Sequence, residues 1–79
     1  MKKISVISII VENAESVVKV NEILHKFSDV IVGRLGLPMK EKKISVICIV
    51  VDTDADTLGS LSGKLGMING VTSKAISSK

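Results

Sequence analysis

The chain has 79 residues, of which 46% are apolar and only Phe27 is aromatic, and its net charge is +3. A chain of this length forms one domain with a marginal core, because folding at this size buries only about 60% of the unfolded surface. The lysines form no basic stripe, which argues against direct nucleic-acid binding, and a single cysteine excludes an internal disulfide. The first residues lack a signal sequence, so we expect a cytoplasmic protein without membrane association.

One strand-like segment occurs twice. Lys2–Val11 reads KKISVISIIV and Lys42–Val51 reads KKISVICIVV, so the second copy is displaced by 40 positions. A helical stripe and a turn follow each copy, which predicts two strand-helix-strand units at about 2–38 and 42–76 within a single domain that spans 1–79. The predicted fold is α+β, a split β-α-β sandwich (βαββαβ) in which two helices cover one face of a four-stranded antiparallel sheet.

The first unit begins with a strand expected at about Lys3–Val11. Asn13 is expected to cap the following helix, with Glu15 in the first turn, where the helix dipole favours negative charge. The residues predicted to face the sheet recur at helical spacing and are Ala14, Val17, Val20, Leu24 and Phe27. This stripe predicts an amphipathic helix.

The second strand is expected from Val30 to about Leu37. Gly33 and Gly36 interrupt it and Pro38 ends it, which is typical of an edge strand. A charged hairpin connection over 39–43 then leads into the second copy of the repeated strand.

The second unit repeats this organisation with different caps. Thr53 or Asp54 is expected to cap the second helix. The residues predicted to face the sheet are Leu58, Leu61 and Leu65. Gly66 is placed to end the helix in the left-handed conformation, and Asn69-Gly70 to turn the chain into a last strand at Val71–Ile76.

Both central strands are apolar on both faces, unlike a strand with one solvated face. In the second copy, for example, Val46, Cys48 and Val50 share one face while Ile47 and Ile49 share the other. Because two helices cover only one face, the other needs a partner, and a second copy of the chain is the economical one. We therefore expect a homo-oligomer, either a dimer or a tetramer.

Three alternating aspartates superficially match a calcium loop. Asp52, Asp54 and Asp56 have the right spacing, but Thr57 stands where such loops need glycine, and Gly63 where they need a bidentate glutamate. Helix capping explains these carboxylates better.

Other chemical sites lack their components. A closed zinc site needs about four ligands, whereas one chain supplies only His25 and Cys48 besides methionines, so we expect no metal and no cofactor. The strand context of Cys48 indicates a small core hydrophobe rather than a nucleophile. No acid, base and nucleophile can be paired from the sequence, and the chain is not expected to be an enzyme.

Arg34 lies within the second strand, close to Gly33 and Gly36. One interpretation is a solvated edge position. The other is an anion clamp, because a guanidinium binds a carboxylate through two parallel hydrogen bonds and the glycines leave space beside it. Lys64 on the second helix would be a weaker accessory in that case.

The second helix carries Gly59 and Gly63, which cost roughly 1 kcal/mol each relative to alanine. At 100° per residue they lie opposite the leucine stripe and leave a smooth groove on the outer side. Either an external backbone approaches closely there, or tertiary contacts let a short helix tolerate glycine.

Several segments together resemble a known family. They are Asn21–Ser28, Gly33–Pro38, Leu61–Gly66, Gly70-Val71 and Lys74. This set, which spans essentially the whole chain, is similar to the small ACT-like proteins that carry the label iron-only hydrogenase system regulator. The resemblance implies a ferredoxin-like, ACT-type domain that is cytoplasmic and oligomeric, with a regulatory label that reflects association with hydrogenase systems. It supplies no activity.

Wider ACT relatives, as the resemblance implies, bind amino acids or other small effectors where domains meet, near the first strand-to-helix loop. Nickel-responsive repressors use a similar domain, but their set of histidines is missing here. The motif positions that carry over, without individual roles, are His25, Arg34, Gly36, Gly63 and Lys64.

The leading hypothesis is a non-enzymatic regulatory module. Its subunit junction, near Asn13, His25 and Arg34, receives a small anionic or amino-acid effector and alters contacts with an unknown protein partner. The candidate effector-binding residues are Asn13, His25, Arg34, Gly36, Gly63 and Lys64. The alternative is a purely structural oligomerisation module with no ligand.

Overall fold

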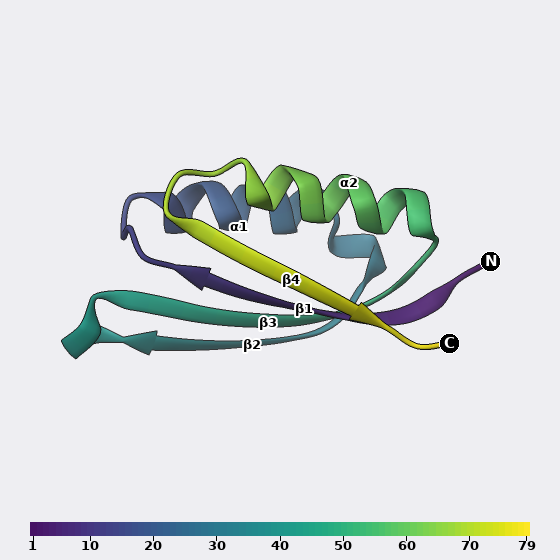
Figure 1. Cartoon of the computed structure of the whole chain (residues 1–79), viewed down its shortest axis with the longest axis horizontal. Helices are drawn as coiled ribbons and strands as arrows, with labels where there is room; N and C mark the ends of the chain where they lie inside the picture. Colours follow the sequence, from purple (N-terminus) through teal and green to yellow (C-terminus); the bar gives the residue numbers. More distant parts are fainter.

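The computed structural model describes residues 1–79 as a two-layer structure, with both helices on one face of a four-stranded sheet (Figure 1). The elements in chain order are β1 (Lys3–Val11), α1 (Ser16–Lys26), β2 (Ile31–Met39), β3 (Ile44–Thr53), α2 (Ala55–Gly66) and β4 (Val71–Ser77), with short 3₁₀ turns at Ser28–Val30 and Lys40–Lys42. The sheet order is β2-β3-β1-β4, and every pairing is antiparallel. The predicted βαββαβ, ferredoxin-like fold is confirmed.

The two copies of the repeated strand form the centre of the sheet. They lie side by side as β1 and β3, with Ser8 opposite Cys48 and Ile7 opposite Ile49. β4 flanks β1, and β2 flanks β3 as an edge strand, as its glycines and proline predicted. The most apolar segments of the chain are thereby concentrated in the two strands with neighbours on both sides.

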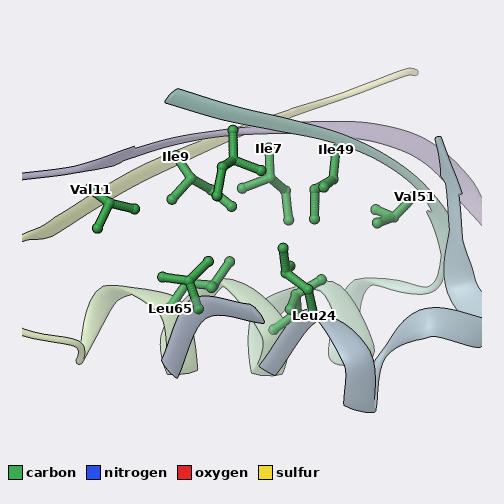
Figure 2. Close-up of a cluster of buried hydrophobic side chains, with 10 residues drawn as sticks. Ile7, Ile9, Val11, Leu24, Ile49, Val51 and Leu65 are labelled. Atoms are coloured by element: carbon green, nitrogen blue, oxygen red, sulfur yellow. The ribbon is translucent and has the colours of Figure 1, made fainter. Parts of the chain in front are cut away.

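The hydrophobic core lies between the sheet and the helices. Figure 2 shows side chains of β1 and β3 pointing towards Leu24 of α1 and Leu65 of α2. The buried apolar residues are Ile7, Ile9, Val11, Val20, Leu24, Ile47, Ile49, Val51, Leu61 and Leu65. Val17, Phe27 and Leu58 are half-buried against this core, which agrees with the predicted stripes. Ala14 is exposed instead, because α1 begins only at Ser16 and Ala14 lies in the turn before it.

The start of α1 differs from the expectation. Asn13 does not cap the helix, and Glu15 occupies the N-cap position rather than the first turn. The Asn13 Oδ1 accepts a hydrogen bond from the Glu15 N–H at 3.1 Å, so its side chain closes the turn that precedes the helix. The buried Ser16 hydroxyl donates to the Asn69 carbonyl at 2.6 Å and ties this helix start to the loop before β4.

Asp54, not Thr53, caps α2. Its Oδ1 accepts a hydrogen bond from the Thr57 N–H at 2.7 Å. This bond to a backbone donor favours the charged carboxylate and lowers the pKa of Asp54 below its ordinary value of 3.8. The first turn of α2 is therefore stabilised by a charge as well as by a hydrogen bond.

Strand β2 and helix α2 do not end as the sequence predicted. β2 continues through Pro38 to Met39, because an edge strand has no ladder partner on its outer side and tolerates a residue without an N–H. Gly66 is the last residue of α2 and is not left-handed; the left-handed glycine is Gly70, with φ of 76°. A Cβ at Gly70 would lie 3.0 Å from the Asn13 Cβ, so conformation and space both require glycine there.

Cys48 is not a core residue. It lies on the sheet face away from the helices, half-buried, with its Sγ 3.9 Å from the Ser8 Oγ. The prediction was wrong because β3 is apolar on both faces, so its sequence does not indicate which face the helices cover.

Neither helix has the length and hydrophobicity that crossing a membrane requires.

The Asp54 cap makes the stability of the fold dependent on pH. The folded-state pKa of Asp54 lies below the unfolded one, so its stabilising contribution is complete above the unfolded pKa and is lost as the pH falls through the folded pKa. We expect Asp54→Ala to lower the denaturant midpoint at neutral pH and the difference from wild type to shrink below the ordinary pKa of 3.8.

The control for this prediction is Asp54→Asn, which still caps a helix but cannot ionise. It should lose less stability than Asp54→Ala at neutral pH. Parallel stability curves for wild type and Asp54→Ala across the acid range would contradict the proposed role of the charge.

Candidate functional site

The sheet face opposite the helices is apolar and uncovered (Figure 1). The strand register shows which residues lie on this face, because residues paired across two strands share a face and successive residues of one strand alternate between the two faces. We call it the open face; its apolar side chains are Ile4, Val6, Ile10, Leu35, Leu37, Met39, Ile44, Val46, Cys48, Val50 and Ile76. Leu35 is 57% and Ile76 73% exposed. The face thus presents a contiguous apolar surface to solvent.

Polar groups on the open face are few. The charged residues that the strands place there are Asp52, at the end of β3, and Lys74, on edge strand β4. Ser8 and Cys48 lie together at its centre. Charge is therefore confined to the margin of the face, which is the distribution found in protein interfaces.

The chain exposes more surface than a folded monomer of its size usually does. Its accessible surface is 5424 Å², whereas a monomer of 8.4 kDa is expected to expose roughly 4600 Å². The excess of about 800 Å² matches what one partner contributes to a standard protein interface.

A second feature is a hollow between α1 and β2. Arg34 lies opposite the core residue Ile49, so its side chain is on the helix side of the sheet. Its guanidinium donates a hydrogen bond from Nη2 to the Asn21 Oδ1 of α1. We call the adjoining space, of about 330 Å³, the Arg34 hollow; it is lined by Asn21, Leu24, His25, Ser28, Ile31 and Arg34.

The lining of the Arg34 hollow favours an anion. It contains the permanent charge of Arg34, the imidazole of His25 and the hydroxyl of Ser28, and no carboxylate. Leu24 and Ile31 supply an apolar wall. An arginine fork beside further hydrogen-bonding groups and apolar carbon is suited to a small carboxylate with an apolar part.

The other predicted site residues lie apart from the Arg34 hollow. Asn13 is beyond the opposite end of α1, a helix roughly 16 Å long, and lines a different hollow of about 570 Å³ beside the β2–β3 hairpin. The Lys64 ammonium lies 5.5 Å from the centre of the Phe27 ring, a cation–π contact. Gly63 is exposed on α2, and Gly36 is on the edge strand. Of the six residues, only His25 and Arg34 share one hollow.

The two further polar residues of the Arg34 hollow, Asn21 and Ser28, were not predicted as site residues. They appeared only as the two ends of the segment Asn21–Ser28, which carries part of the family resemblance. Neither could be assigned from the sequence, because the pairing of Arg34 with Asn21 depends on which face of β2 the arginine occupies. No group of three or more His, Cys, Asp or Glu side chains is positioned to hold a metal ion.

Solved structures that share the fold include two proteins of low sequence identity. The formyltetrahydrofolate deformylase of Pseudomonas putida KT2440 is 9% identical, with a TM-score of 0.67 over 92% of this chain and 28% of that one. The divalent ion tolerance protein CutA1 of Ehrlichia chaffeensis is 18% identical, with a TM-score of 0.53 over 100% of this chain and 84% of that one. At these identities the likeness concerns the fold alone.

A much stronger similarity is to protein TM1266 from Thermotoga maritima. The two chains are 44% identical over 100% of each, and their structures superpose with a TM-score of 0.95. The family model described as "TM1266-like: Iron-only hydrogenase system regulator, putative" matches residues 3–75. No match was found among curated proteins. With nearly its whole length matched, this chain belongs to the TM1266-like family.

Proposed function

We propose that this protein is a non-enzymatic regulatory module of an iron-only hydrogenase system. In this proposal it acts in the cytoplasm as a homo-oligomer, binds a small anionic effector in the Arg34 hollow and alters contacts with a protein partner. The family description supports the regulatory role. The single observation that carries the assembly is the uncovered apolar face.

Packing two copies through their open faces would create a second core. Sheets that pack face to face lie about 10 Å apart, and their side chains interdigitate. In this dimer the interdigitating side chains would include Ile10, Val46 and Leu37. The helices would then cover the outside of a four-layer dimer. Lys74, on an edge strand, would remain near the rim, where a charge keeps its water.

The composition of the Arg34 hollow supports binding rather than catalysis. His25 and Ser28 are its only residues of the types that serve as base and nucleophile. A catalytic imidazole is normally oriented by a third group, most often a carboxylate, and none lines this hollow. Its volume of about 330 Å³ is at the small end of the range for ligand pockets.

The position of Arg34 suggests how effector binding would change the contacts between subunits. The Arg34 side chain contacts α1, and the next residue, Leu35, lies on the open face opposite Cys48. An effector that competes with Asn21 for the guanidinium would change how β2 is held against α1. That change would alter the shape of the open face, so the effector would favour one packing of the subunits over another.

Assembly is tested with one substitution at the middle of the open face. Ile10 is 40% exposed, so a lysine there can fold in the monomer but would be buried in a face-to-face dimer. We expect sedimentation velocity to give an oligomer for wild type and at least a tenfold weaker association for Ile10→Lys. In cells that contain this protein and an iron-only hydrogenase, Ile10→Lys should alter hydrogenase activity as deletion of the protein does.

The matched control is Val18→Lys, because Val18 is 61% exposed on α1 and away from the sheet. It should leave both the oligomer and the hydrogenase activity unchanged. A wild-type chain that stays monomeric at high concentration would refute the assembly.

The effector is tested by calorimetry with a panel of amino acids and small carboxylic acids. We expect at least one to bind wild type and to bind Arg34→Ala at least tenfold more weakly, because a bidentate contact to the guanidinium is lost. Arg34→Lys should bind with an affinity between those of wild type and Arg34→Ala, since lysine keeps the positive charge but not the two-pronged guanidinium. Lys19→Ala, an exposed change on α1, serves as the control.

Absence of binding to wild type across the whole panel would remove the effector from the proposal. An intact oligomer without any ligand would then support the alternative, a purely structural oligomerisation module.

A further inference from the structure

The Arg34 hollow is rich in hydrogen-bond donors and poor in acceptors. A guanidinium only donates, so the amide oxygen of Asn21 must face Arg34, and its amide N–H groups are left for another partner. Arg34 has several N–H donors and keeps some of them after this bond. His25 adds a ring N–H and Ser28 a hydroxyl. Most free hydrogen-bonding groups of the lining are therefore donors, which a ligand with several oxygen acceptors would satisfy.

This lining does not suit a ligand with an ammonium group. An ammonium only donates, and it needs carboxylate or other oxygen acceptors around it. No carboxylate lines the Arg34 hollow, and the Asn21 Oδ1 is already engaged by Arg34. In an α-amino acid the ammonium is bonded to the carbon that carries the carboxylate. Binding of that carboxylate to Arg34 would thus place the ammonium close to a second positive charge.

His25 provides a second position for a negative group. It follows Asn21 by four residues in α1, so the two side chains are neighbours on one side of the helix, with Cβ atoms about 6 Å apart. Asn21 in turn holds the Arg34 guanidinium. The imidazole therefore lies about one helical turn from the residue that fixes the guanidinium, and both groups line the same hollow.

Charged groups from two elements surround His25. Arg34 faces it from β2, and Glu22 and Lys26 flank it on the outer side of α1. The turn after α1 contributes the Ser28 hydroxyl to the hollow but no charged side chain. Histidine side chains change their charge between about pH 5 and 8. A protonated His25 would share a small space with Arg34, and two positive groups placed in this way favour a ligand with two negative groups.

The hollow also offers an apolar surface for a short carbon chain. Leu24, which lies between Asn21 and His25 in α1, is 2% exposed and belongs to the core. Ile31, at the start of β2, is half-buried against the same core. Because the core holds both side chains in place, the apolar wall is preformed. Methylene groups that join two carboxylates would pack against it.

We propose that the effector of the Arg34 hollow is a short dicarboxylic acid without an amino group. One carboxylate accepts two parallel hydrogen bonds from the Arg34 guanidinium. The other lies against protonated His25, with the Ser28 hydroxyl as a further donor. Such an acid presents acceptors at both ends, as the donor-rich lining requires. This inference rests on the effector site proposed above and narrows its ligand to one chemical class.

Acids that share one carbon skeleton test the chemical class. Butyrate is succinate without the second carboxylate, and L-malate and L-aspartate are succinate with an added hydroxyl or ammonium group. In calorimetry at about pH 6.5, where histidine is partly protonated, we expect succinate to bind about fivefold more tightly than butyrate. L-Malate should likewise bind about fivefold more tightly than L-aspartate, because only the latter brings an ammonium group into the hollow.

His25→Gln tests the second contact, because glutamine keeps a hydrogen-bond donor but does not ionise. It should abolish the preference for succinate over butyrate and leave the affinity for butyrate unchanged. In wild type that preference should decline as the pH rises from about 6.5 to 8, and in His25→Gln it should not change. The matched control is Lys26→Gln, which removes a positive charge one residue away, outside the Arg34 hollow, and should behave as wild type. Both residues are exposed, so each variant should fold.

Butyrate or L-aspartate that binds as tightly as succinate would overturn the dicarboxylate class and leave the effector site in place. Inorganic phosphate that displaces succinate at equal concentration would overturn the class as well, since the hollow would then accept any small anion. Equal losses of the preference for succinate in His25→Gln and Lys26→Gln would overturn the contact with His25. No binding of any of these acids to wild type would refute the effector site itself, and the dicarboxylate with it.

Discussion

The constraint on which this structure depends is a mismatch between its strands and its helices. β1 and β3 have apolar side chains on both faces, but the chain contains only enough helix to cover one. Burial on the helix side gives a compact core around Ile49 and Leu61, and the same two strands leave an equally apolar layer in contact with water. The domain accordingly exposes about 800 Å² more accessible surface than a typical monomer of its mass.

β2 belongs to both features from which the proposed function is argued, the Arg34 hollow and the open face. Successive residues of this strand point to opposite faces, so Arg34 reaches the hollow beside α1 while Leu35 belongs to the open face. The backbone between them forms the outer edge of the sheet. A change in the position of β2 against α1 would thus alter the Arg34 hollow and the open face together, without any long pathway between separate sites.

Local rules predicted the order and type of the elements, although the expected Asn13 cap, left-handed Gly66 and strand end at Pro38 did not hold. The repeated segment predicted the two central strands, and the glycines and proline of β2 predicted an edge. Thr53 and Asp54 were the two predicted candidates for the α2 cap, and Asp54 provides it. The sequence was insufficient wherever two faces were chemically equivalent. Cys48 was assigned to the wrong layer and Asn21 was missed as the partner of Arg34, because no alternation of polar and apolar residues distinguishes the sides of these strands.

The position of Arg34 on β2 gives the proposed effector a short route to the proposed dimer. If two copies pack through their open faces, Leu35 would lie in that interface, since it belongs to the open face. An effector held by Arg34 would act one residue away, so its binding energy could shift the balance between two packings of the subunits. A protein partner that recognises only one of these packings would then respond to the effector without contacting it.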